Sequence, residues 1–299
     1  MITWIEVLVA MVVAALLAYA VIAMIASVHM DRTVALSVNS LIEKSEAATT
    51  EAAPYDPLEL TGLPEPVVRY FEFALSPGQA PIVHARFEQK GQFATKPGKW
   101  RPFRGVEHFT VMPPAFIWDA SIRMAPLVPV RVLDSYADGV GSMNGRLASL
   151  VTVVNAGGDG RMAQAALQRY LAEAAWLPTA LLPRSGVQWT PIDEHSARAT
   201  IADGRVEASV DFHFAPHGEI TSVYAERYRA VGDDQVLTPW EGRFTGYRRW
   251  NGMMIPAEAE VAWILPEGRA PYWRGRTIDF ACMLAPLAAM TAVGDPPER

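Results

Sequence analysis

A run of 24 residues near the N-terminus, from Val7 to Met30, contains no Asp, Glu, Lys or Arg. A helix rises by about 1.5 Å per residue, so this run spans a hydrocarbon core of about 30 Å with some tilt. A cleaved signal peptide typically has a basic N-terminal region, a shorter apolar core and a small-x-small cleavage site. Here Glu6 precedes the run, and its exit offers no convincing cleavage motif. The sequence therefore predicts a retained transmembrane anchor over residues 1–30.

The charges that flank this anchor bear on its orientation. Arg32 and Lys44 lie on its C-terminal side, and no basic residue precedes it. The positive-inside rule then favours a cytoplasmic location for the rest of the chain. With only two charges involved, the sequence leaves the side of the membrane open.

Residues 31–62 are predicted to form a juxtamembrane helix and an acidic linker. Four apolar residues at i, i+4, i+7 and i+8 mark one face of a helix: Val34, Val38, Leu41 and Ile42. The stretch from Ala47 to Pro57 is rich in Ala, Thr, Glu and Pro, which is typical of a linker. Residues 31–62 carry six acidic and two basic residues, and therefore most of the formal net charge of −6. The remaining chain is nearly neutral, which argues against nucleic-acid binding because that depends on neutralising phosphates.

Residues 63–283 are predicted to form a single β-rich domain, followed by a C-terminal tail over 284–299. Turn signals recur every 8 to 14 residues between segments rich in β-branched and aromatic residues, a pattern typical of antiparallel sheets. The expected strands are 82–93, 99–111, 116–124, 128–136, 147–154, 197–201, 206–214, 220–228, 240–247, 257–264 and 272–283, with another starting at Gln188. A helical insertion interrupts them near 160–183, and a short helix is expected over 67–75. The predicted class is mainly β (α+β), a strongly curved antiparallel sheet or half-barrel with a helical lid.

The only cysteine is Cys282, which excludes a disulfide scaffold and a cysteine-based zinc site. Asp211 and His213 are two residues apart on one expected strand and so share a face, and His217 follows across a turn. Such a set suits a zinc site or a histidine base oriented by a carboxylate, but polar residues on the wet face of a strand give the same pattern. We expect no metal and no cofactor, and these three residues are candidates for a hydrolase-like site.

A second set of residues suits an apolar or amphipathic ligand. Aromatic and aliphatic side chains alternate along the strands and along one face of the expected helix, where they form either an ordinary core or the wall of a pocket beneath a helical lid. The basic pair around Gly275 suits an anionic headgroup, or cross-strand pairing with glutamates. The candidate ligand-binding residues are Trp118, Met124, Tyr136, Leu167, Tyr170, Trp240, Trp263, Trp273 and Arg274.

Several motifs resemble a family of uncharacterised bacterial proteins that often carry an N-terminal membrane helix. They include Leu63-Pro64-Glu65-Pro66, Asp138-Gly139-Val140-Gly141-Ser142-Met143, Thr238-Pro239-Trp240-Glu241-Gly242 and Pro271-Tyr272-Trp273-Arg274-Gly275. The resemblance covers almost all of 63–276 and implies no established activity. The sheet–helix–sheet order is also similar to the half-barrel of lipoprotein-localisation and lipid-carrier proteins. That likeness implies a domain outside the cytoplasm, which is the side we expect.

These patterns lead to three hypotheses. The first is a non-catalytic, membrane-tethered binding protein for a lipid or other apolar ligand, held in a cavity between the sheet and the helix. The second is a structural or interaction module of the cell envelope. The third is an enzyme that uses the Asp211 and His213 pair. The expected partners are the bilayer and a lipid or apolar ligand, and the sequence leaves the oligomeric state open.

Overall fold

The computed structural model describes residues 3–49, 52–126, 128–232 and 234–287. The helices are α1 (Trp4–Ala48), η1 (Pro57–Leu60), α2 (Glu65–Ala74), α3 (Gly160–Glu173), η2 (Ala174–Trp176), η3 (Pro178–Leu181) and η4 (Pro183–Ser185). The strands are β1 (Ile82–Lys96), β2 (Lys99–Thr110), β3 (Ala115–Ala125), β4 (Val128–Ala137), β5 (Val140–Leu147), β6 (Val151–Gly157), β7 (Gln188–Asp193), β8 (Ser196–Asp203), β9 (Val206–Phe214), β10 (Ile220–Val231), β11 (Asp234–Thr245), β12 (Arg248–Trp250), β13 (Met253–Ile255), β14 (Glu258–Leu265) and β15 (Gly268–Leu284).

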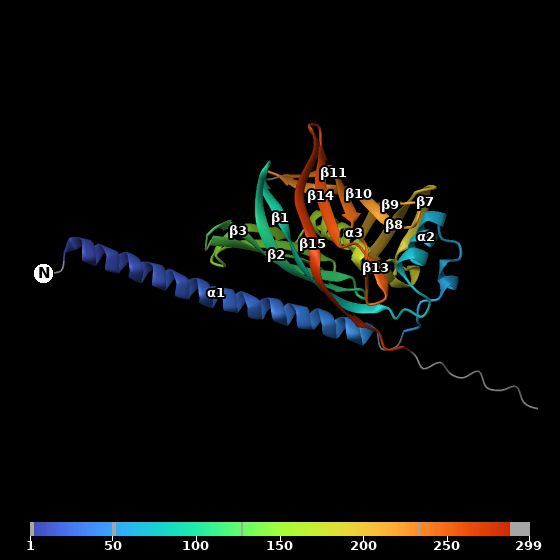
Figure 1. The fold of residues 1–299 in the computed structure, drawn as a ribbon, viewed down its shortest axis with the longest axis horizontal. Helices are drawn as coiled ribbons and strands as arrows, with labels where there is room; N and C mark the ends of the chain where they lie inside the picture. The colour runs from blue at the N-terminus through green and yellow to red at the C-terminus, as the bar shows by residue number, and fades with distance from the viewer. Residues whose placement is uncertain (1–2, 50–51, 127, 233, 288–299) are drawn as a thin grey trace, which may run out of the picture.

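Within the described residues, 13 strands form one antiparallel sheet in the order β6-β5-β4-β3-β2-β1-β15-β14-β11-β10-β9-β8-β7. The remaining pair, β12 and β13, forms a separate hairpin. Two wings, each built from consecutive hairpins, meet at a seam between β1 and β15. The sheet curves strongly (Figure 1), and the expected class, a curved antiparallel sheet with few helices, is confirmed.

Helix α3 fills the concave side of this sheet. It packs against β4 and β5 of the first wing and against β9 and β10 of the second. Its side chains are buried on most sides, with Leu167, Tyr170 and Leu171 almost inaccessible. Next to it the Tyr136 hydroxyl on β4 donates a hydrogen bond of 2.7 Å to the Asp203 carboxylate at the end of β8. The two wings therefore meet across α3, and the helix is the interior filling of a half-barrel.

Side-chain alternation gives each strand two different faces. The inner face, turned toward α3, carries a continuous aromatic core that includes Phe87, Phe109 and Phe116, all fully buried. The outer face carries the alternate positions, such as Arg86 on β1 and His108 on β2. A polar residue can therefore sit one position away from the core and still reach solvent.

Helix α1 runs without a break from its apolar segment onto the outer face of the first wing (Figure 1). Val38 and Leu41 pack against Ala115 and Ile117 of β3, as the helical spacing of the apolar residues implies. Nearer the N-terminus, Asp31 forms an ion pair of 2.6 Å with Arg131 on β4. In the described part of the chain, α1 is the one helix long and apolar enough to cross a membrane, judged by length and composition.

The structure corrects two expectations about chain segments. The expected linker from Ala47 to Pro57 is partly packed, because Tyr55 is buried and its N–H donates to the Gln79 carbonyl over 2.8 Å. An aromatic ring anchors this segment despite its Ala- and Pro-rich composition. The strand expected over 147–154 is wrong, because a turn with positive φ at Ala148 and Ser149 separates β5 from β6.

The expected tail over 284–299 falls largely outside the described residues. Its first residue ends β15, and the next, Ala285, is buried and donates its N–H to the Pro81 carbonyl over 2.8 Å. Residues 288–299 lie beyond the described part of the chain.

Candidate functional site

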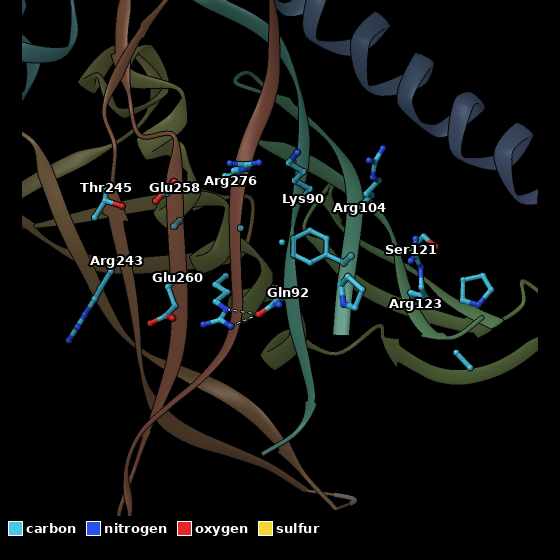
Figure 2. Close-up of a pocket in the computed structure, with 18 of the residues that line it drawn as sticks. Lys90, Gln92, Arg104, Ser121, Arg123, Arg243, Thr245, Glu258, Glu260 and Arg276 are labelled. Atoms are coloured by element: carbon cyan, nitrogen blue, oxygen red, sulfur yellow. Dashed lines mark hydrogen bonds between the residues drawn. The ribbon is translucent and has the colours of Figure 1, made fainter. Parts of the chain in front are cut away.

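A groove of about 970 Å³ is hollowed into the outer face of the sheet (Figure 2). It crosses β11, β14, β15, β1, β2 and β3, so the seam between the wings lies at its centre. Its charged lining consists of six basic and two acidic residues: Lys90, Arg104, Arg123, Arg243, Arg274, Arg276, Glu258 and Glu260. The groove is therefore strongly cationic in a domain that is nearly neutral as a whole.

Strand register arranges the lining into two rows that run across the strands. In the first row each residue lies opposite the next: Ser121, Arg104, Lys90, Arg276, Glu258 and Thr245. The second row contains Gln92, Arg274, Glu260 and Arg243. Like charges directly opposite each other destabilise a sheet. The three adjacent cations of the first row therefore carry an electrostatic cost that a bound anion would offset.

The carboxylates near the groove are mostly engaged elsewhere. Arg269 forms ion pairs of 2.5 Å with both Glu241 and Glu260, and Arg243 pairs with Glu241 at 3.0 Å. Among the described residues, no carboxylate oxygen lies within 4.0 Å of the charged nitrogens of Lys90, Arg104, Arg123, Arg274 or Arg276. These five side chains are available to an anionic ligand.

Arg274 is held ready in the groove by two neutral neighbours. Its guanidinium donates to the Gln92 side-chain carbonyl, with 3.0 Å from Nε, and lies 4.5 Å from the centroid of the Trp100 ring. Neither contact neutralises its charge. The structure thus places one of the residues expected to bind ligand, Arg274, in this groove.

Two glycines allow the two longest strands, β1 and β15, to approach each other closely in the groove. Gly91 of β1 lies opposite Gly275 of β15, and a Cβ on Gly91 would lie 2.0 Å from the Arg274 carbonyl oxygen. Only glycine permits this approach. Both glycines line the groove at this close approach of β1 and β15.

The groove continues toward α1. A second pocket of about 400 Å³ shares Arg104, Ser121 and Pro129 with the first and adds Ser27 of α1. Ser27 lies near the end of the uncharged run, so the cationic groove reaches the place where the apolar segment ends.

The other expected ligand-binding residues lie on the inner side of the sheet. Trp118, Tyr136, Leu167, Tyr170 and Trp240 belong to the core, and none is more than 3% exposed. Met124, Trp263 and Trp273 are half-buried and pack against that core. None of the eight lines the groove. Side-chain alternation predicts that they share a face, but it does not predict that α3 occupies the space between them. A ligand contact by these residues stays a prediction.

The three candidate catalytic residues lie apart from the groove. The Asp211 carboxylate accepts hydrogen bonds of 2.6 and 2.8 Å from Arg198, and the side chains of His213 and His217 are exposed. The carboxylate that the hydrolase hypothesis assigns to orienting a histidine is thus bound to an arginine. Within the described ranges, no cluster of three or more His, Cys, Asp or Glu residues is suited to a metal ion.

The inner face also holds a buried charged cluster that the sequence did not predict. Arg169 of α3 forms ion pairs of 2.5 Å with Glu107, 2.6 Å with Asp134 and 2.9 Å with Glu173. Gln89 donates to Glu107 over 3.0 Å. Burial, followed by the neighbouring Glu173 carboxyl, raises the pKa of Glu107 well above its ordinary value. The cluster joins α3 to β2 and β4.

Together the fold and the groove define a helix-filled half-barrel that follows an apolar helix and has a cationic groove on its outer face. The chain belongs to a family of unknown function (DUF6920), whose model matches residues 61–280. This agrees with the family resemblance expected from the motifs. A search of curated proteins found no match.

A comparison with solved structures also found the expected second likeness. The LolA superfamily protein NE2245 from Nitrosomonas europaea is 10% identical to this chain, with a TM-score of 0.35. The match covers 72% of this chain and 90% of that protein. A similarity at this level carries no information about what the present chain binds.

Proposed function

We propose that this protein is a non-catalytic, membrane-tethered binding protein for an anionic lipid or similar amphiphile. The observation that carries the proposal is the row of Arg104, Lys90 and Arg276, three adjacent cations without a carboxylate within ion-pair distance in the described residues. Guanidinium and ammonium groups bind phosphate and carboxylate headgroups through charge-assisted hydrogen bonds. The proposal moves the ligand from the inner face, where the sequence places it, to the outer face.

The lining of the groove also suits the rest of an amphiphile. Toward α1 the basic residues give way to the apolar side chains of Ala125, Val128 and Pro129. A headgroup bound at the row of cations would direct its hydrocarbon toward these residues and toward the helix. Such a division between a charged and an apolar end is what recognition of a lipid requires.

We propose that α1 is retained as the tether. The same continuous helix contains the apolar segment and the residues that pack on the domain, with Leu41 in an apolar cluster and Asp31 paired to Arg131. Retention keeps the groove beside the bilayer, since Ser27 lines the adjoining pocket. A lipid can then exchange between membrane and groove without crossing open water.

The proposal is tested by replacing the row of cations with neutral residues in the combined variant Lys90→Gln, Arg104→Gln and Arg276→Gln. Each basic residue near an anionic headgroup contributes about 1 kcal/mol, so we expect retention of phosphatidylglycerol to fall at least about tenfold. Native mass spectrometry of the full chain in detergent, after incubation with phosphatidylglycerol or phosphatidylcholine, measures the retained lipid.

The control variant is Arg205→Gln, Arg248→Gln and Arg249→Gln, which removes three exposed bases that do not line the groove. It should retain phosphatidylglycerol like the wild type. Equal retention by the groove variant, or equal retention of both lipids by the wild type, contradicts the proposal. A wild-type chain that retains neither lipid favours the alternative, a structural or interaction module of the cell envelope.

A further inference from the structure

Two hairpin ends of the first wing form one surface beside α1, which we call the apolar tips. They consist of Ala125, Pro126, Val128 and Pro129 at the β3–β4 turn, and residues 147–151 at the β5–β6 turn. The Ala148 N–H donates to the Pro129 carbonyl over 2.8 Å, so the two turns are joined. Large apolar side chains are exposed here, with Val151 at 59% and the adjacent Val153 at 51%.

The two chain segments that form the apolar tips contain no acidic residue, and the acids nearest in space, Asp31 and Asp119, are both paired with Arg131. The chain from Ala120 to Leu133 contains two arginines and no acid, and the chain from Gly139 to Gly158 contains one arginine and no acid. Exposed apolar turns that carry no acid of their own match the interface of an anionic bilayer. It is a poor match for open water, which favours charged residues at turns.

The apolar tips lie level with the membrane-facing part of α1. Pro129 and Ser149 line the same pocket as Ser27, and Arg131 Nη1 lies 3.5 Å from the Ser27 carbonyl oxygen. Shielding of α1 begins still earlier, inside the uncharged run, at Ala23. The alanines at positions 10, 14, 15, 18 and 20 are exposed, so the partial burial of Ala23 does not come from the helix itself.

Strand β3 extends along α1 toward its N-terminus (Figure 1), and β4 pairs with it. The β3–β4 turn lies beyond Pro129, since Ala125 pairs with Val128 at the end of this hairpin. An uncharged run of 24 residues is about 36 Å long, which exceeds a hydrocarbon core of about 30 Å by a few ångströms. The apolar tips therefore reach the depth at which headgroups meet hydrocarbon.

We propose that the apolar tips insert into the interface of the bilayer crossed by α1, where the lipid is anionic. This second contact fixes the domain against the membrane and turns the adjoining end of the cationic groove toward the headgroups. The inference rests on the proposed tether, and it adds a contact that an anchor helix alone does not provide. The other candidate for covering this surface is a second copy of the chain, paired through the exposed edge strand β6.

The test attaches an environment-sensitive fluorophore to single cysteines in a Cys282→Ala background of the full chain. The labelled variants are Val151→Cys at the apolar tips, Leu17→Cys in α1 and Ile192→Cys on β7, an exposed site (49%) at the opposite edge of the sheet. The protein is reconstituted in vesicles of phosphatidylglycerol and phosphatidylcholine. We expect the Val151 probe to show blue-shifted emission and loss of quenching by aqueous iodide, as the Leu17 probe does, while the Ile192 probe stays quenched.

The outcomes separate this inference from the proposed function. A shielded Leu17 probe with a fully quenched Val151 probe overturns the inference and leaves the tether intact. An unshielded Leu17 probe contradicts the tether itself. A Val151 probe that is protected equally in detergent without lipid, in a concentration-dependent way, identifies a second copy as the occupant and also overturns the inference.

Discussion

Replacing Arg169 with methionine is expected to lower the free energy of unfolding by about 3 to 5 kcal/mol. The substitution removes the cation that links Glu107, Asp134 and Glu173 and leaves their carboxyl groups buried without a partner of opposite charge. Denaturant unfolding of the full chain in detergent, followed by tryptophan fluorescence, measures the loss. Since α3 fills the half-barrel, the variant should also loosen the contact between the wings.

The matched control is Arg161→Met on the same helix. Arg161 is exposed and lies 5.3 Å from the Tyr228 ring centroid, so the expected loss is less than about 1 kcal/mol. Adding Glu107→Gln to Arg169→Met should restore part of the stability, because it removes one of the unpaired carboxyls. Equal stability of the Arg169 and Arg161 variants would show that the buried cluster contributes nothing net.

The same variant has an expected pH dependence. Burial raises the pKa of Glu107 above 4.5, its ordinary value, so the folded chain takes up a proton there more readily than the unfolded chain. That contribution to stability is present at low pH and is lost as the pH rises through the raised pKa. Removing Arg169 removes a cation that lowers this pKa, so the deficit of the variant should be larger at pH 8 than at pH 5.

Acidification is expected to destabilise the wild type through a pair of histidines on the outer face. His84 Nε2 and His108 Nδ1 are 3.0 Å apart with stacked rings. Burial, with Arg86 beside the pair, lowers the pKa of His84 from 6.5 to about 4, and burial together with His84 lowers that of His108 to about 4. The unfolded imidazoles accept protons below about 6.5, so stability present above that pH is lost between 6.5 and 4.

We expect His84→Gln with His108→Gln to remove about 2 to 3 kcal/mol of this loss, after allowance for partial solvent screening. Unfolding free energies at several pH values between 7 and 4 give the slope. The control, His213→Gln with His217→Gln, deletes two exposed imidazoles and should follow the wild-type slope. If the variant without His84 and His108 shows the same dependence of unfolding free energy on pH as the wild type, other groups cause the loss of stability in acid.

Local sequence patterns predict most of the strands. They fail where a glycine is required by a close contact with a distant part of the chain rather than by a turn. The segment from Gly139 to Gly145 looks like one long turn, yet only Asp138 and Gly139 form the turn and β5 follows at once. Gly141 is required because a Cβ there would lie 2.6 Å from the Met162 carbonyl oxygen of α3. Such a contact joins residues distant in sequence, so no local pattern reveals it.

The candidate site was predictable only in part for a similar reason. Arg274 and Arg276 stand out as a local basic cluster, whereas Lys90 and Arg104 lie in two other strands, far from them in the sequence. They join Arg276 only through the pairing of β1 with β2 and β15. No local pattern singles out Arg169 either, because its partners Glu107 and Asp134 come from two strands of the first wing. The alternation of side chains along each strand predicts that the aromatic residues share one face of the sheet. It does not predict that α3 covers that face.

The pairing of β1 with β15 has a consequence for biosynthesis. The first strand of the domain to be synthesised, β1, cannot pair with β15 until β15, the last strand, has emerged from the ribosome. During that interval α1 is already complete, and the first wing has no partner for the free edge of β1. The cationic groove straddles this pairing, so it is the final feature to form. A chain interrupted before Gly268 would possess the apolar helix and lack the β15 side of the groove.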